Sequence, residues 1–323
     1  MGNKKKHPLF MRLGMTGIFT ATTFAGGVFA REQLAYRTAK KHNIAPTDPN
    51  VFFADLPCGT VSYKKTGYGV PLLLLHDFYN GANHKEWDYV QKRLSQSYTV
   101  YALDFIGFGN SEKIATPGTA YLYSRCVSEF LEHVITKKAY VVGSTGGGDM
   151  AMIASKWAEQ YIEKLVLVSP KGFHHTLPSP HQASVLKKLL QPFFGTLHFL
   201  NGTEKRKLQR ELECKFFAKE KLKKWYINEA HTIARLSKNS KFSYATIASH
   251  FWNVYIIDTF AKTTIPYAIF WGEENEENPL LYLEKGKDLR DDGVFVSFEK
   301  TGTFPHIENP QGFATALIDF LLD

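Results

Sequence analysis

The chain has 323 residues, of which 44% are hydrophobic, 14% aromatic and 22% charged. This composition is typical of a folded protein and excludes disorder over most of the length. The formal net charge of +8 favours acidic partners or an anionic lipid surface, but no nucleic-acid-binding module accompanies it, so no nucleic-acid partner is expected. The cysteines at positions 58, 126 and 214 stand apart from one another and offer neither a disulfide framework nor a zinc site.

The N-terminal segment is basic and then apolar. Lys4–Lys6 and Arg12 precede an uncharged run, residues 13–30, whose 18 residues are at the short end for a bilayer-spanning helix. The run is interpreted as a signal anchor, as a cleaved signal peptide with Val28 and Ala30 before the cut, or as an apolar helix packed on the domain. Membrane association through this segment is expected. Cations flank both ends, so the side of the membrane is not fixed, with the extracytoplasmic side narrowly favoured.

Strand-like and helix-like segments alternate after this segment. Strands are predicted at residues 51–54, 60–64, 71–75, 98–103, 139–142 and 164–168. Helical periodicity is found at residues 83–96, 121–135 and 148–160. Such alternation predicts a mostly parallel sheet with helices on both faces.

The alternation stops for about ninety residues and then resumes. Residues 174–262 have a mostly helical pattern, after which strands are predicted at 267–271 and 294–298 and a last helix at 310–322. The sequence therefore predicts a core formed by residues 43–173 and 263–323, a helical cap at 174–262 inserted after the sixth strand, and a separate N-terminal segment at 1–42.

Five motifs lie at the ends of the predicted strands. They are Leu74-Leu75-His76-Asp77-Phe78, Leu103-Asp104-Phe105-Ile106-Gly107-Phe108-Gly109-Asn110-Ser111, Val142-Gly143-Ser144-Thr145-Gly146-Gly147-Gly148, Phe270-Trp271-Gly272-Glu273-Glu274-Asn275 and Thr301-Gly302-Thr303-Phe304-Pro305-His306-Ile307-Glu308-Asn309-Pro310. In this order, the motifs resemble those of cap-bearing members of the α/β-hydrolase superfamily, over residues 51–323. The resemblance implies an α/β-hydrolase fold and a Ser-His-Asp type of site.

The third motif corresponds to the nucleophile elbow, which requires small residues two positions before and two after the nucleophile. Gly143 and Gly147 satisfy this requirement only if Thr145 is at the nucleophile position. Ser144 would place a valine in the first of these positions and is the less suitable alternative. A threonine hydroxyl can act as a nucleophile, but only if a base accepts its proton.

The resemblance implies that the other two triad positions also depart from the family pattern. The histidine position is Thr303 and the acid position is Asn275. His306 matches a second histidine that relatives carry three residues later, where it is usually structural, and it is the alternative base. The glutamates around Asn275 are typical of a solvated loop.

The resemblance also assigns an oxyanion hole and its surroundings. Backbone N–H groups of Phe78 and Gly146 are in the matching places, and His76 and Asp77 line the expected pocket. Asp77 replaces a glycine, and a carboxylate there would oppose the negative charge of a tetrahedral intermediate.

Two functions follow from these departures. In the first, the chain is weakly active or non-catalytic and binds a small apolar ligand or a partner in the pocket under the cap. In the second, it is an active hydrolase of ester-type bonds that uses Thr145 or Ser144 with His306. The catalytic activity itself is therefore left open, and no oligomeric state is specified.

The cap carries nine Lys or Arg residues within residues 205–224, which indicates a solvated helix face or contact with an anionic membrane surface. No cofactor is expected, because the glycines at 146–148 fit an elbow turn and not a dinucleotide fingerprint or a phosphate loop. No metal site is expected either.

Overall fold

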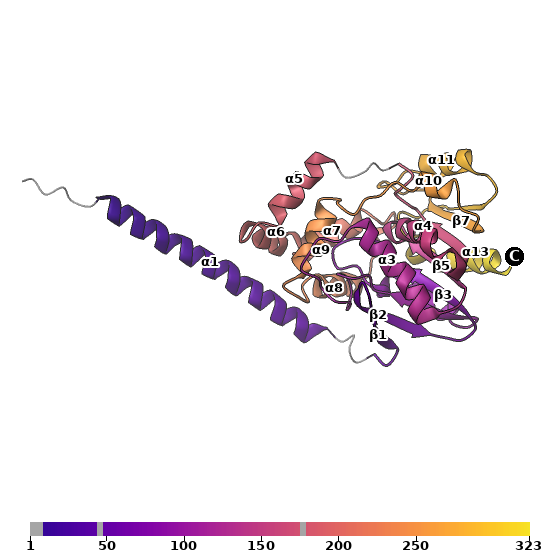
Figure 1. Ribbon diagram of the computed structural model, residues 1–323, viewed down its shortest axis with the longest axis horizontal. Coiled ribbons are helices and arrows are strands. Elements are labelled where there is room, and N and C mark those ends of the chain that lie inside the picture. The colour runs from indigo at the N-terminus through magenta and orange to yellow at the C-terminus, as the bar shows by residue number, and fades with distance from the viewer. Residues whose placement is uncertain (1–8, 44–47, 175–178) are drawn as a thin grey trace, which may run out of the picture.

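The computed structural model describes residues 9–43, 48–174 and 179–323, with side chains from residue 23 onward. Eight strands form one sheet in the order β1-β2-β4-β3-β5-β6-β7-β8 (Figure 1). β1 and β2 pair antiparallel, β2 pairs antiparallel with β4, and all the remaining pairs are parallel. The strands are β1 Val51–Leu56, β2 Gly59–Thr66, β3 Val70–Leu75, β4 Tyr98–Leu103, β5 Ala139–Ser144, β6 Ile162–Val168, β7 Tyr267–Gly272 and β8 Val294–Phe298. The predicted mostly parallel sheet is therefore confirmed.

The central strand β3 shows how the sheet forms two cores. Its four consecutive leucines, residues 72–75, have no exposed surface. Because successive side chains of a strand point to opposite faces, Leu73 and Leu75 join one apolar core and Leu72 and Leu74 join the other. A strand that is buried on both faces explains the continuous apolar run in the sequence.

Helices cover both faces of this sheet. α3 (Ala120–Phe130) packs against α4 (Gly146–Ala158) over the first core, and α2 (Asp88–Leu94) packs against α13 (Pro310–Leu322) over the second. Two short helices, α10 (Ile257–Phe260) and α12 (Pro305–Glu308), and the longer α11 (Leu281–Leu289) complete the core.

Helices lie between β6 and β7, in the segment for which a cap is predicted, and we call five of them the cap. Its helices are α5 Pro180–Leu189, α6 Phe194–Gly202, α7 Lys205–Glu213, α8 Lys224–Ile233 and α9 Ser240–Ala248. Three of them, α5, α6 and α9, share a small apolar core that includes Leu189, Phe199 and Tyr244. Residues 175–178 lie outside the described part of the chain, so the first residue of the cap stays a prediction.

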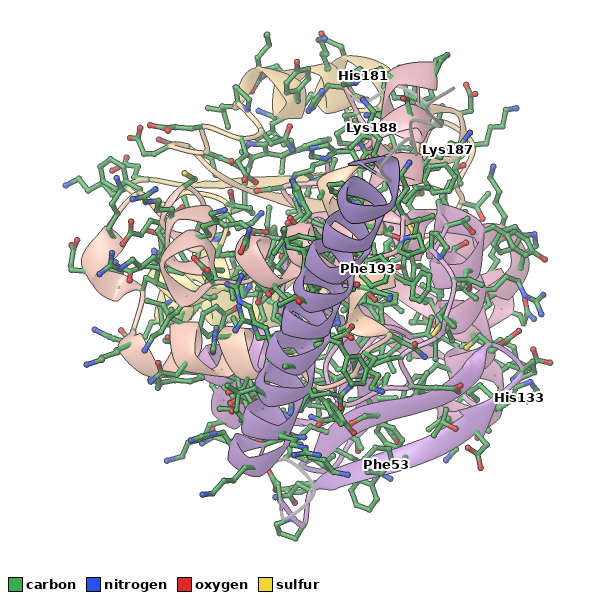
Figure 2. All side chains as sticks on the ribbon, turned by 90° about the vertical axis from the view of Figure 1, so that its left-hand side faces the viewer. Phe53, His133, His181, Lys187, Lys188 and Phe193 are labelled. Atoms are coloured by element: carbon green, nitrogen blue, oxygen red, sulfur yellow. The ribbon has the colours of Figure 1, made fainter. Side chains whose placement is uncertain are left out.

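The N-terminal helix α1 (Leu9–His42) packs on the cap through its second half. Arg31 donates a 2.8 Å hydrogen bond to Asn201 Oδ1 and forms a 2.8 Å ion pair with Glu204, and Lys238 Nζ lies over the Phe29 ring. Figure 2 shows α1 crossing the face of the molecule that the cap occupies, and Figure 1 shows its first half extending past the cap. These contacts involve Phe29 and Arg31, at the end of the apolar run, so the third interpretation of residues 13–30 stays a prediction.

No helix within the described residues is long and apolar enough to cross a membrane. The side chains of residues 9–22 lie outside the described part, so the signal-anchor and signal-peptide interpretations stay predictions, as does membrane association.

The turn from β5 into α4 leaves no room for side chains at two glycines. A Cβ on Gly143 would lie 2.4 Å from the backbone of Gly148, and a Cβ on Gly147 would lie 2.5 Å from the carbonyl oxygen of His76. Between them, Thr145 has φ of +46°, a conformation that costs a β-branched residue energy. The spacing of the glycines thus identifies the residue at the bend.

We expect Gly147→Ala to lower the free energy of unfolding by about 1–3 kcal/mol, because the added methyl group meets fixed backbone and forces the turn to shift. Gly26→Ala is the matched control: it lies within α1 and a Cβ there meets nothing within 4 Å, so it should cause no loss. Urea unfolding followed by circular dichroism measures both. Equal midpoints for Gly147→Ala and the parent protein would contradict this packing.

Candidate functional site

Thr145 lies at the bend and is fully buried, as is Ser144. The Thr145 amide donates to the carbonyl oxygen of Val168 at 2.7 Å, which joins the bend to β6. The hydroxyl oxygens of Ser144 and Thr145 are 3.3 Å apart. The two candidate nucleophiles therefore interact with each other.

Thr303 and Asn275, the residues at the assigned histidine and acid positions, lie side by side. The Thr303 hydroxyl donates to Asn275 Oδ1 at 3.0 Å, and the same oxygen accepts the amide of Asn278 at 3.0 Å. Thr303 and Asn275 are both buried. Neither a hydroxyl nor an amide accepts a proton near neutral pH, so this pair supplies hydrogen bonds and no general base.

His306 lies in an apolar setting beside Glu86. Its ring is fully buried and stacks on Trp87 with centroids 4.3 Å apart. Its Nε2 is 3.3 Å from Glu86 Oε1, and within the described residues neither ring nitrogen makes a hydrogen bond. The ring is therefore not bonded to either candidate hydroxyl.

The carboxylate of Asp77 accepts a hydrogen bond from the Gly146 N–H, which the resemblance assigns to the oxyanion hole. Its Oδ1 accepts the Gly146 N–H at 3.1 Å, and the carboxylate has no exposed surface. The rings of Phe78 and Trp252 cover the same glycine, since a Cβ there would lie 2.7 Å from the first and 2.8 Å from the second. The Gly146 N–H is therefore already hydrogen-bonded to a carboxylate of the protein itself.

His76 holds the loop that carries Asp77. Its Nε2 accepts the Phe105 N–H at 3.2 Å, so the proton is on Nδ1, which donates to the Asp77 carbonyl oxygen at 2.7 Å. Burial lowers the pKa of His76, which keeps the ring neutral at physiological pH.

A lysine of the cap forms an ion pair with Asp77. Lys215 is 3% exposed, and its Nζ is 2.9 Å from Asp77 Oδ2 and 2.9 Å from Glu277 Oε2. Lys171 Nζ lies 3.3 Å from the same oxygen of Glu277. Four charges of alternating sign therefore connect the core to the cap, and we call Asp77, Lys215, Glu277 and Lys171 the charge chain.

The charge chain is ionised at neutral pH. Burial by itself raises the pKa of Asp77, but Lys215, Lys171 and the hydrogen bonds to the carboxylate together outweigh burial, and the net pKa is about 2. Burial also raises the pKa of Glu277, but the same two lysines and the hydrogen bond from Lys215 outweigh it and leave the pKa at about 2. Burial lowers the pKa of Lys215, but the two carboxylates outweigh it and raise the pKa above the usual range. A permanent negative charge therefore lies against Gly146 N–H.

Three members of the charge chain were missed by sequence reasoning. Glu277 is exposed, as expected for this run of glutamates, but it also pairs with two lysines. Lys215 belongs to a stretch that was interpreted as a solvated face or a lipid contact, but it is buried. Asp77 could have indicated that a cation lies nearby, because a buried carboxylate beside the elbow requires a positively charged partner.

A pocket of about 260 Å³ lies between core and cap next to the charge chain. Its polar lining includes Lys171, Glu211, Lys215 and Glu277, and its apolar lining includes Phe78, Ile247 and Trp252. Thr145 is not among the lining residues. The pocket therefore adjoins the charged lysines and not the candidate nucleophile.

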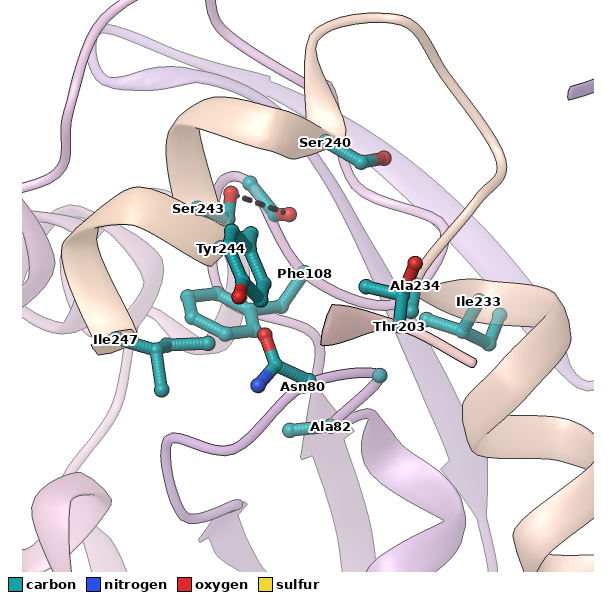
Figure 3. Close-up of a pocket in the computed structure, with 12 residues that line it drawn as sticks. Asn80, Ala82, Phe108, Thr203, Ile233, Ala234, Ser240, Ser243, Tyr244 and Ile247 are labelled. Atoms are coloured by element: carbon teal, nitrogen blue, oxygen red, sulfur yellow. Dashed lines mark hydrogen bonds between the residues drawn. The ribbon is translucent and has the colours of Figure 1, made fainter. Parts of the chain in front are cut away.

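A second cavity between core and cap holds only about 20 Å³, room for a single water molecule (Figure 3). Asn80, Phe108 and Tyr244 line it, and the Ser243 hydroxyl donates to the Gly107 carbonyl oxygen beside it at 2.9 Å. This contact fastens α9 to the core.

The geometry agrees with comparisons with known proteins. Residues 70–310 match the family model described as alpha/beta hydrolase fold, and the chain belongs to this family. A structure of a serine hydrolase involved in carbazole degradation has a TM-score of 0.71 at 21% identity, covering 84% of this chain and 98% of its own. A membrane phospholipase A structure has a TM-score of 0.68 at 18% identity, covering 97% and 96%.

Two curated relatives are similar in sequence. An uncharacterized protein of Mycobacterium tuberculosis is 28% identical over 139 residues, 42% of this chain, and the match spans only 40% of that protein's length. The 2-hydroxy-6-oxo-6-(2'-aminophenyl)hexa-2,4-dienoic acid hydrolase of Metapseudomonas resinovorans is 24% identical over 281 residues, which cover 80% of this chain and 86% of the hydrolase.

We expect Lys215→Met to lower the free energy of unfolding by about 3–5 kcal/mol, because it leaves Asp77 buried without its cation. The double variant Asp77→Asn with Lys215→Met should recover much of this loss, since the uncompensated charge is then gone. Urea unfolding of the parent, both single variants and the double variant forms a mutant cycle. Additive losses would contradict direct coupling.

The charge chain also predicts that the free energy of unfolding falls at acid pH. The pKa of Asp77 is about 2 when folded against an ordinary 3.8, so its contribution to stability is complete above about pH 4 and is lost as the pH falls towards 2. We expect Asp77→Asn to be less stable than the parent at pH 7 but to lose less stability between pH 4 and 2. Urea unfolding at half-unit pH steps measures this, and equal slopes would contradict it.

Proposed function

We propose that this chain is a non-catalytic member of the α/β-hydrolase family that binds a small ligand between core and cap. The observation that carries the proposal is the 3.1 Å hydrogen bond from Gly146 N–H to the buried carboxylate of Asp77. This N–H is one of the two donors that the resemblance assigns to the oxyanion hole, with that of Phe78.

The filled oxyanion hole opposes catalysis in two ways. Removing one oxyanion donor lowers kcat by about 10²–10³-fold in hydrolases, and here the Gly146 donor is already used. In addition, the ionised Asp77 repels the negative charge that a tetrahedral intermediate would develop. Lys215 does not cancel this fully, because it is shared with Glu277.

The assigned triad positions support the same proposal. Thr145, Thr303 and Asn275 contain no imidazole and no carboxylate. Loss of the histidine alone from a serine-protease triad lowers kcat by about 10⁶-fold. Without a base, the Thr145 hydroxyl keeps its proton and does not attack.

The alternative of an active hydrolase gains no support from His306. To accept a proton from Thr145 or Ser144, its ring would have to leave the stack on Trp87. Pro305 begins α12 directly before it and restricts the backbone of this loop. We therefore favour the non-catalytic function.

The residues that line the pocket indicate the chemical class of the expected ligand. Phe78, Ile247 and Trp252 offer apolar surface, as expected for an apolar ligand. The adjoining lysines and glutamates add a strongly polar wall. We infer a small ligand that has an apolar body and one polar group, because an uncharged apolar molecule would leave this wall unsolvated.

A panel of p-nitrophenyl esters tests the proposal. We expect the parent protein to show background hydrolysis, and the triple variant Thr145→Ser, Asn275→Asp, Thr303→His to remain close to background because Asp77 still fills the oxyanion hole. Adding Asp77→Gly to the triple variant should produce weak esterase activity. The matched control is a quadruple variant with Thr145→Ala in place of Thr145→Ser and the other three substitutions unchanged.

Two results would contradict the proposal. The first is hydrolysis by the parent protein that disappears in both Thr145→Ala and His306→Ala. The second is a triple variant that is as active as the quadruple variant, which would show that Asp77 does not block the site. Circular dichroism confirms that each variant is folded.

A further inference from the structure

A groove of about 780 Å³ lies between α1 and the cap, away from the pocket described above. One wall is formed by α1 with Leu34 and Ala39, and the other wall includes Trp225 of α8 and Arg235 just after it. Its volume is within the range of small-molecule sites. The groove exists because only one stripe of α1 touches the cap.

The charges of the groove are unbalanced. Three cations line it: Arg31, Lys205 and Arg235. Arg31 is paired with Glu204 at 2.8 Å. The lining carboxylate of Glu229 is already held by Lys85 of the core at 2.7 Å. Within the described residues, neither Lys205 nor Arg235 has a carboxylate at ion-pair distance.

Two histidines line the groove, His42 and His231, and His231 lies in the same positive field. The pKa of His231 falls to about 4, because burial and then the nearby Arg235 and Lys205 disfavour its charged form. His231 is therefore neutral at physiological pH. An anion that enters the groove would meet two cations that have no carboxylate of their own at ion-pair distance within the described residues, while the lining carboxylate of Glu229 is held by Lys85.

Arg235 is held in place before any ligand arrives. Its Nε donates to Thr203 Oγ1 at 3.0 Å and its Nη2 donates to the Leu200 carbonyl oxygen at 2.8 Å. A guanidinium that is already fixed loses little conformational entropy on binding an anion. Lys205 is at the start of α7 and is exposed.

We propose that this groove binds an amphiphile with one anionic head group and one apolar chain. The head group lies at Lys205 and Arg235, and the chain lies along Leu34, Ala39 and Trp225. A carboxylate and a phosphate share the required chemistry, so a fatty acid and a lysophospholipid are the two sources. This site does not depend on the proposed function of the pocket under the cap.

The test uses the full chain and 9,10-dibromostearate below its critical micelle concentration, because bromine quenches tryptophan fluorescence at short range. We expect saturable quenching that is largely lost in Trp225→Phe. A lysophosphatidate with the same brominated chain should also quench, and the tighter of the two identifies the head group. The methyl ester of the brominated acid, which has no charge, should bind at least tenfold more weakly.

Lys205→Gln is the decisive variant, because its side chain is exposed and its loss should not disturb folding. We expect it to weaken binding of dibromostearate about tenfold, as for loss of one charge-assisted hydrogen bond. Arg235→Gln should do at least as much. Lys137→Gln removes an exposed charge far from the groove in sequence and should leave the affinity for dibromostearate unchanged.

Three outcomes would overturn the proposal. They are equal affinity for the acid and its methyl ester, unchanged affinity in Lys205→Gln, and quenching that occurs only with micelles or with phosphatidylglycerol vesicles. The last result would indicate contact with a membrane surface in place of a ligand in the groove.

Discussion

The carboxylate of Asp77 has no exposed surface, and an isolated charge at that depth would cost several kcal/mol. Lys215 offsets this cost at 2.9 Å, and Glu277 and Lys171 extend the charge chain. Because Lys215 comes from the cap, the same contact that permits a charge beside the elbow also fixes the cap on the core. The same ion pair between Lys215 and Asp77 therefore both compensates the charge at the site and holds the cap on the core.

The fold could be predicted from the sequence because its signals are local. Gly143 and Gly147 identify the bend from spacing alone, and the backbone contacts their Cβ atoms would make explain why. The leucines of β3 form a continuous apolar run that only a doubly buried strand uses. In both cases, the residues that carry the signal are neighbours in the chain.

The site could be predicted only in part, because its partners are distant in sequence. Lys215 is 138 residues from Asp77, and it occurs in a stretch with nine Lys or Arg residues. Burial is what distinguishes it, and burial depends on how the cap packs. Glu277 is exposed like the neighbouring glutamates, and only the approach of Lys215 and Lys171 in the folded chain sets it apart. The groove beside α1 was equally beyond reach, because it requires the docking of α1 through Arg31.

The charge chain constrains how a ligand reaches the pocket under the cap. Lifting the cap would separate Lys215 from both Asp77 and Glu277 and would break both ion pairs. The attraction between these charges therefore favours the closed cap. The pocket is lined by residues of the core and the cap together, so entry along the seam between them leaves the charge chain intact. A scaffold of this kind suits binding at a closed interface better than a reaction cycle that opens and closes a lid.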